Sequence, residues 1–100
     1  MILGTSTLFA AFNDLKFFMS AKTGGFSAPP YYLNMSFSVG DDEENVKKNR
    51  LLFYNVIKID RHRIAQPKQI HSDTVKIADN PGYYDDCDAL VTNKKELFLS

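Results

Sequence analysis

The sequence has a single cysteine, Cys87, and no tryptophan among its 100 residues. One cysteine cannot form a disulfide within the chain, which is typical of proteins in a reducing compartment. No apolar run approaches the ~20 residues that span a bilayer. The N-terminus also lacks the basic region and apolar stretch of a signal peptide. We therefore expect a cytoplasmic protein without a membrane segment.

Net charge is also absent, because 12 basic residues balance 12 acidic ones. Proteins that bind nucleic acid or acidic membranes usually carry a basic excess, so we expect neither partner. The hydrophobic share of 44% and the charged share of 24% are ordinary for a soluble globular domain. A chain of this length can form one small domain with a modest core. Its eight phenylalanines predict a core rich in aromatic rings.

One helix is predicted from about residue 42 to about residue 57. Two aspartates and two glutamates at 41–44 can cap its start and favour the positive end of the helix dipole. Val46 and Phe53 share a face that should pack on a sheet. Arg50 falls on the same stripe, where an arginine usually lies at the edge with its head in water or on a carboxylate. Anion binding by Arg50 is the alternative.

Alternating or β-rich runs predict several short strands, although helix is the second choice for residues 15–20. We predict an α/β (α+β) fold with a mixed, mostly antiparallel sheet and one main helix. An apolar strand as the last element suggests an incomplete part of a larger sandwich-like domain. The predicted strands are 7–12, 15–20, 33–39, 64–66, 74–78, 89–92 and 97–99.

Two glycines, Gly24 and Gly25, interrupt the strand pattern and allow positive φ and a close approach of the backbone. A surface loop is the commoner interpretation of such a stretch, and a loop shaped to pass a ligand is the alternative.

His71 lies just before the predicted strand 74–78. An imidazole there could bind a metal or move a proton. Zinc, however, needs three or four ligands, and the sequence has no C-x-x-C or H-x-x-x-H spacing. Spacing alone therefore favours a structural or solvated His71. Cys87 is expected to be a small apolar packing residue. No G-x-S-x-G, phosphate-loop or dinucleotide motif is present.

Six segments, taken together and in order, resemble the multicopper polyphenol oxidoreductase family. This is the YfiH-type laccase-domain family, which is associated with purine nucleoside phosphorolysis and also named for peptidoglycan editing. The order and spacing fit from about Phe12 to Ser100. The resemblance implies that residues 1–100 are the N-terminal portion of a single laccase-domain fold, roughly two-fifths of a family member. The segments are KTGGFS at 22–27, LNMS at 33–36, VGDD at 39–42, NR at 49–50, QIHS at 69–72 and DCDALVT at 86–92.

The resemblance implies that His71 is one zinc ligand of a His/Cys/His site, with copper as the alternative metal. In the family the other two ligands lie beyond the point where this chain ends. Cys87 does not occupy the family's cysteine position, and no metal role is carried onto it. The metal-centred pocket would bind a purine nucleoside and phosphate. The binding candidates are Lys22, Gly24, Gly25, Asn34 and Arg50, and Arg50 is also the candidate catalytic residue.

The function implied is the N-terminal part of a zinc-dependent purine nucleoside phosphorylase and adenosine deaminase, combining transferase and hydrolase chemistry. With one of three ligands, the chain should bind zinc weakly and catalyse little by itself. The alternative is a non-catalytic fragment or interaction module that self-associates through an open sheet edge. Copper polyphenol oxidase is the older family label, and one histidine gives it no support.

Overall fold

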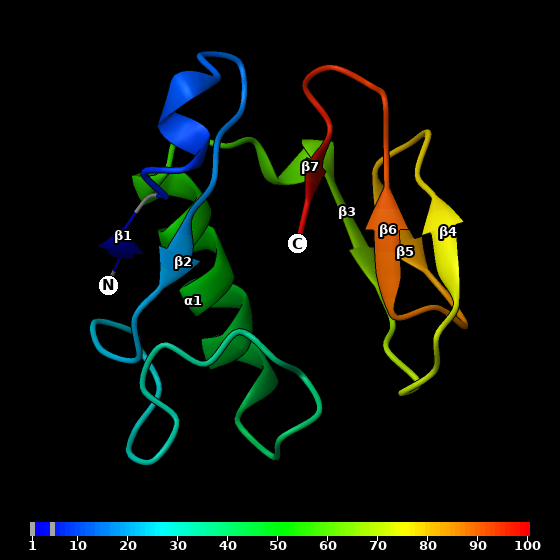
Figure 1. Ribbon diagram of the computed structural model, residues 1–100. Helices are drawn as coiled ribbons and strands as arrows, with labels where there is room; N and C mark the ends of the chain where they lie inside the picture. The colour runs from blue at the N-terminus through cyan, green and yellow to red at the C-terminus, as the bar shows by residue number, and fades with distance from the viewer. Residues whose placement is uncertain (1, 5) are drawn as a thin grey trace. The chain divides into compact units, whose positions relative to one another are not determined.

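The computed structural model describes residues 2–4 and 6–100, which fall into two compact units, Met1–Lys58 and Ile59–Ser100 (Figure 1). We describe each unit by itself. The first contains β1 (Ile2–Gly4), a 3-10 turn η1 (Phe9–Ala11), β2 (Met19–Ser20) and α1 (Glu43–Val56). The second contains η2 (Arg61–Arg63), β3 (Ile64–Pro67), β4 (Val75–Ile77), β5 (Gly82–Tyr84), β6 (Ala89–Val91) and β7 (Phe98–Leu99).

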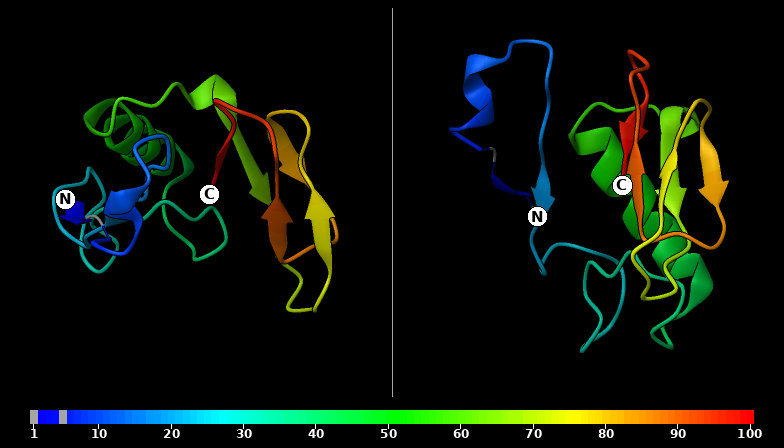
Figure 2. Two further views of the ribbon diagram at one scale, coloured as in Figure 1. Left: turned by 45° about the horizontal axis from the view of Figure 1, so that its top comes forward. Right: turned by 45° about the vertical axis from the view of Figure 1, so that its right-hand side comes forward.

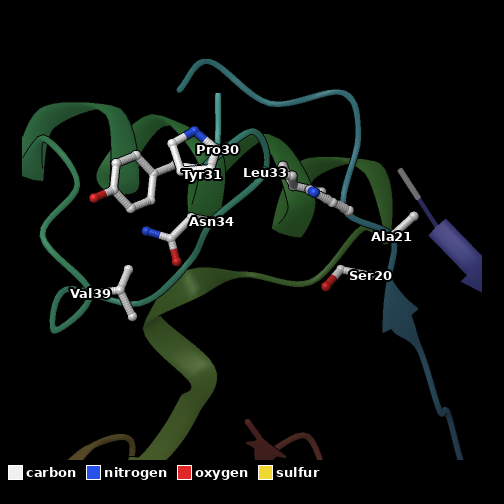
Figure 3. Close-up of a pocket in the computed structure, with 8 residues that line it drawn as sticks. Ser20, Ala21, Pro30, Tyr31, Leu33, Asn34 and Val39 are labelled. Atoms are coloured by element: carbon white, nitrogen blue, oxygen red, sulfur yellow. The ribbon is translucent and has the colours of Figure 1, made fainter. Parts of the chain in front are cut away.

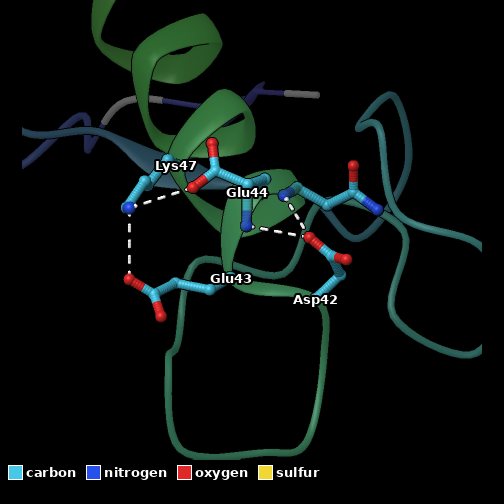
Figure 4. Close-up of polar contacts among 5 residues, drawn as sticks. Asp42, Glu43, Glu44 and Lys47 are labelled. Atoms are coloured by element: carbon cyan, nitrogen blue, oxygen red, sulfur yellow. Dashed lines mark hydrogen bonds and ion pairs between the residues drawn. The ribbon is translucent and has the colours of Figure 1, made fainter.

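The α1 helix confirms the prediction over 42–57, and its start is set by local chemistry. Asp42 is the N-cap, and its Oδ1 accepts hydrogen bonds from the N–H groups of Glu44 at 2.8 Å and Asn45 at 3.2 Å (Figure 4). The Lys47 ammonium lies 3.1 Å from the carboxylates of both Glu43 and Glu44. These pairs are exposed and add only a few tenths of a kcal/mol each.

Asn49 is the polar centre of the first unit. It lies on the buried face of α1 with Val46 and is completely inaccessible to solvent. Its Oδ1 accepts the N–H of Phe26 at 2.6 Å, and its Nδ2 donates to the carbonyl oxygens of Tyr32 at 3.2 Å and Asn34 at 2.8 Å. A buried amide needs all of these partners, so α1 and the loop of residues 26–34 hold one another in place.

The strand predicted over 33–39 was wrong, because this segment consists of turns, a bend and irregular chain. The N–H of Asn34 donates to the Tyr31 carbonyl at 2.9 Å, and the Asn34 Oδ1 accepts the N–H of Ser36 at 2.9 Å. A short amide side chain that bonds to nearby backbone competes with strand pairing. The strand predicted over 7–12 is instead the turn η1, and only Met19–Ser20 of 15–20 is a strand.

The second unit corrects the expected strand direction. β3 pairs in parallel with β5 and β7, and β4 pairs in parallel with β6. Only β1 and β2, in the first unit, pair antiparallel among the described residues. In each of these pairs the two strands are at least two places apart in the order of strands along the chain. The segment between two paired strands returns the chain to the end of the sheet where the first strand began. The paired strands therefore run in the same direction (Figure 2). "Mostly antiparallel" was therefore wrong.

The strand β5 was also missed, because no strand was predicted over residues 82–84. It pairs with β3 through Ala65↔Gly82 and Gln66↔Tyr83. The predicted strands 64–66, 74–78, 89–92 and 97–99 are confirmed as β3, β4, β6 and β7, with shorter ends for β4, β6 and β7.

The core is small and largely aliphatic, so the expectation of an aromatic core was wrong. Phe53 is buried, whereas Phe12, Phe26 and Phe37 are 58, 57 and 44% exposed. The other buried apolar side chains are Leu33, Val46, Ile59, Ile64, Ala65, Ala78 and Cys87. Within the part of the chain that the structure describes, no helix has the length and apolarity needed to cross a membrane.

We expect Asn49→Asp to destabilise the first unit by about 3 kcal/mol or more. The change keeps the shape of the side chain but turns two carbonyl oxygens and a carboxylate toward one another in a buried place. Urea unfolding followed by far-ultraviolet circular dichroism of α1 measures the loss. The control is Asn55→Asp, because Asn55 is exposed on the same helix, and a surface change should stay within about 0.5 kcal/mol. Equal losses in the two variants would contradict the role of Asn49.

Candidate functional site

His71 lies in the loop between β3 and β4, exposed to solvent, with a backbone φ of 61°. This left-handed conformation is uncommon for a residue with a side chain. The loop is held by the carboxylate of Asp88. One oxygen accepts the N–H of Ile70 at 2.9 Å and of His71 at 2.8 Å, and the other accepts the N–H and the hydroxyl of Ser72, each at 2.5 Å. Asp88 was not predicted from the sequence as a partner of this loop.

The parallel pairing of β4 and β6 places Asp88 beside the histidine loop. Val75 is opposite Ala89 in the register, and the N–H of Asp88 donates to the Thr74 carbonyl at 3.0 Å. A residue 17 positions further along the chain than His71 is thereby fixed next to it by the sheet. Figure 2 shows β4 and β6 side by side in both views.

The hydrogen bonds stabilise the ionised form of Asp88. The hydroxyl of Ser72 makes the largest contribution, partial burial opposes it, and the N–H groups of Ser72, His71 and Ile70 add to it. Together they lower the pKa of Asp88 from 3.8 to about 2. The carboxylate therefore stays ionised across the neutral range and remains able to accept all four bonds.

The chemistry of His71 fits one position of a metal centre, because an exposed imidazole on a fixed loop can bind a metal through a neutral nitrogen. Within residues 2–4 and 6–100, no group of three or more His, Cys, Asp or Glu side chains is arranged to hold an ion. Cys87 is fully buried, and its Sγ lies 3.5 Å from the Tyr84 carbonyl, which confirms the expected packing role. Zinc requires three or four ligands, so the described residues do not form a complete zinc site by themselves.

The first unit contains an open pocket of about 390 Å³. Two of the predicted binding residues, Lys22 and Asn34, line it together with Ser20 and Ala21. Figure 3 labels Asn34, Ser20 and Ala21 in this lining. The volume lies within the range of small-molecule sites. The rest of the lining combines aromatic and aliphatic side chains, from Pro30, Tyr31, Leu33 and Val39.

Lys22 and Asn34 play different parts in this pocket. The Lys22 ammonium lies 4.8 Å from the centre of the Tyr32 ring and its side chain is exposed, so it can attract an anion. The Asn34 amide is already used, because its Nδ2 donates to the Ser36 carbonyl at 2.9 Å and to the Asp41 carboxylate at 3.2 Å. Asn34 therefore shapes the pocket wall.

Asp41 joins this wall to the polar centre formed by Asn49. Its carboxylate accepts the Ser27 hydroxyl at 2.5 Å, and that hydroxyl in turn accepts the Asn49 amide at 2.9 Å. Partial burial acts to raise the pKa of Asp41, but the hydrogen bonds from Ser27, Asn34 and the Asp42 N–H lower it overall. The wall is thus tied to α1 by an ionised carboxylate.

The structure explains why glycine is needed at the two predicted binding positions, Gly24 and Gly25. Gly24 has a φ of 95°, and a side-chain carbon added to Gly25 would lie 2.5 Å from the Leu33 Cα and 2.7 Å from the Asn49 Oδ1. The loop can therefore approach α1 only without a side chain at Gly25.

Arg50 is half-buried and contacts the segment that follows the pocket wall. Its Nε donates to the Met35 carbonyl at 2.7 Å, and its Cζ lies 4.5 Å from the centre of the Phe37 ring. The guanidinium thus packs on an aromatic ring and bonds to backbone, which stabilises a turn segment.

Sequence reasoning missed Asn49 and Asp88, two side chains that each make four hydrogen bonds. Both lie in the segments 49–50 and 86–92 that carry the family resemblance, which is the signal that could have drawn attention to them. Neither segment identifies its partners, because those are 15 to 23 residues away in the sequence.

The family model described as "Multi-copper polyphenol oxidoreductase laccase" matches residues 16–100. Among curated proteins, the chain is 36% identical over 84 residues to a purine nucleoside phosphorylase of Mycobacterium tuberculosis, covering 81% of this chain and 34% of that protein. It is 34% identical over 94 residues to a purine nucleoside phosphorylase of Streptomyces coelicolor, covering 88% and 38%. The chain therefore spans about a third of the length of these relatives.

Two crystal structures are similar in fold. The hypothetical protein YfiH of Bacillus licheniformis gives a TM-score of 0.71 at 31% identity, covering 78% of this chain and 33% of that one. YlmD of Geobacillus stearothermophilus gives a TM-score of 0.83 at 24% identity, covering 90% and 37%. The second likeness supports the fold alone.

The depressed pKa predicts an acid-dependent loss of stability in the second unit. The stabilisation from ionised Asp88 is complete above its ordinary pKa of 3.8 and should be lost as the pH falls toward about 2. Nuclear magnetic resonance signals of the buried residues Ala65 and Ala78, followed in urea between pH 5 and pH 2, measure the change. In Asp88→Asn this part of the pH dependence should disappear. An unchanged pH profile in that variant would contradict the assignment.

Proposed function

The chain belongs to the multi-copper polyphenol oxidoreductase laccase family, and we propose that it forms the N-terminal third of a purine nucleoside phosphorylase. The observation that carries the proposal is the identity of 34 to 36% with relatives of that name. Phosphorolysis breaks the bond between ribose and purine and joins the ribose carbon to a phosphate oxygen. The protein must therefore bind a purine nucleoside and an anion side by side.

The pocket of the first unit supports this activity. Its volume of about 390 Å³ suits part of a nucleoside, and Tyr31 and the exposed Val39 offer an aromatic ring and an aliphatic surface. Lys22 provides a cation for phosphate, which lysine binds as a point charge. We assign the Gly24–Gly25 backbone and Asn34 to shaping this site. Arg50 remains a candidate for phosphate binding and catalysis.

We further propose that His71 is one ligand of a zinc ion, with the other ligands outside residues 1–100. Copper, which the family description names, is the alternative metal. When bound, zinc supplies a Lewis acid and an activated water, which would suit deamination of adenosine as a second activity. The part played by this chain is to hold the imidazole of His71 in a fixed loop.

A second candidate function is an interaction module that pairs with another copy of itself. One face of the parallel pair β4–β6 is apolar and open, because Val75, Ile77 and Val91 are 56, 67 and 50% exposed. Unpaired strand edges next to such a face favour association. Sedimentation velocity distinguishes the two functions, since a stable dimer of the 100-residue chain would favour the module and a monomer would not.

We expect inosine phosphorolysis and stoichiometric zinc in the full-length gene product that carries these residues, and neither in the 100-residue chain by itself. The reason is that the chain spans about a third of its relatives and holds one ligand. Release of hypoxanthine in phosphate buffer and metal analysis by mass spectrometry are the measurements. Phosphorolysis by the short chain would contradict the incomplete site, and failure of the full-length product would contradict the function.

We expect Lys22→Gln to raise the KM for phosphate at least ~10-fold in the full-length product, because a neutral amide loses the ionic part of the contact. The matched control is Lys16→Gln, an exposed lysine of the same unit, which should leave the KM unchanged. Arg50→Ala tested in the same assay decides the other candidate. An unchanged phosphate dependence would reject the role of whichever residue was replaced.

A further inference from the structure

We infer that Asp88 is the positioning residue of His71, fixing the backbone of residues 70–72 so that the imidazole is presented in one direction. The link to a metal rests on the proposed function, whereas the link between carboxylate and loop rests on geometry alone. Asp88 is not itself assigned contact with metal or substrate.

The first argument is the number and direction of the hydrogen bonds. Both oxygens of Asp88 are used, and they accept three consecutive N–H groups, from Ile70, His71 and Ser72, at 2.5 to 2.9 Å. The hydroxyl of Ser72 adds a fourth bond at 2.5 Å. A single planar group that binds three successive amides leaves the loop little freedom to rotate.

The second argument is the conformation of the residue that the loop presents. His71 has a φ of 61°, a left-handed conformation that is unfavourable for a residue with a side chain. An exposed loop would relax to a commoner conformation unless something held it. The charge-assisted bonds to Asp88 offset this cost, and they act on the histidine's own N–H.

The third argument is that Asp88 is anchored on both sides. Its N–H donates to the Thr74 carbonyl at 3.0 Å, and Ala89 after it is paired with Val75 of β4. Cys87 before it is fully buried. The carboxylate is therefore placed by the sheet, and sites supported by rigid elements hold their ligands more precisely than sites built on loops alone.

The first experiment uses the 100-residue chain. Asp88→Asn keeps one carbonyl oxygen but faces the N–H of Ser72 with an amide that cannot accept it. We expect hydrogen exchange at the amides of Ile70, His71 and Ser72 to accelerate at least ~10-fold, and the amide–Hα coupling of His71 to leave the value for positive φ. Ser72→Ala removes one bond only and should give a smaller acceleration, which keeps the test open if Asp88→Asn fails to fold.

The matched control is Asp79→Asn, which removes an exposed carboxylate from the same unit and should leave the exchange rates of residues 70–72 unchanged. Equal acceleration in Asp79→Asn would mean that loss of any negative charge in this unit speeds the exchange, and it would overturn the specific role of Asp88. No acceleration in either Asp88→Asn or Ser72→Ala would overturn the inference that Asp88 holds the loop.

The second experiment measures zinc affinity in the full-length gene product by competition with a chelating dye. Loss of a group that orients a metal ligand typically costs 10- to 100-fold in affinity, and we expect a loss in that range for Asp88→Asn. Ile64→Val is the stability control, because it weakens the buried core of the same unit without touching the loop. It should bind zinc as the unchanged protein does.

The two failures are distinguishable. Zinc binding by the unchanged protein with equal affinity in Asp88→Asn would overturn the positioning role and leave the proposed function intact. No zinc in the unchanged protein would overturn both the proposed metal site and the metal part of the inference, while the exchange experiment would still decide whether Asp88 fixes the loop. An equal loss of affinity in Ile64→Val would reduce Asp88 to a structural role.

Discussion

The structure depends on the need to satisfy backbone polar groups in long segments that form neither helix nor sheet. Residues 21–41 and 68–74 lack regular secondary structure, so their N–H and carbonyl groups need other partners. Asn49 meets this need in the first unit, and Asp88 meets it in the second. With a small aliphatic core in each unit, these two side chains carry much of the specificity that packing supplies in larger domains.

The same two side chains support the candidate site. The loop held by Asn49 and Asp41 forms one wall of the pocket next to Lys22, and the loop held by Asp88 carries His71. In both units a polar group on a helix or beside a strand fixes a loop that presents an exposed side chain. Functional groups are commonly placed in this way, on loops that a rigid element positions.

The structural features that were predicted correctly from the sequence are those set by contacts between residues close together in the chain. The start of α1 was predictable because the N–H groups that donate to the capping Asp42 belong to residues within three positions of it. The irregular conformation of residues 33–39 was not predictable, because the alternating pattern there also suits turns. The Asn34 side chain accepts the N–H of Ser36 and so competes with strand pairing. Strand direction in the second unit was not predictable either, since it depends on which distant strands pair. For the site, the resemblance pointed to His71 and Lys22, whereas the roles of Asn49 and Asp88 come from contacts far apart in the sequence.

A ligand fixed before its metal arrives has an energetic consequence. A flexible histidine would lose conformational freedom on binding, and that loss would weaken the metal's affinity. The loop of His71 gives up this freedom when the second unit folds, because Asp88 already holds its backbone in a left-handed conformation. The free-energy cost of ordering the loop is therefore part of folding and not of metal binding. In the proposed metal site, the exposed His71 would therefore meet the metal on a loop whose backbone is already held by Asp88, a residue just before β6.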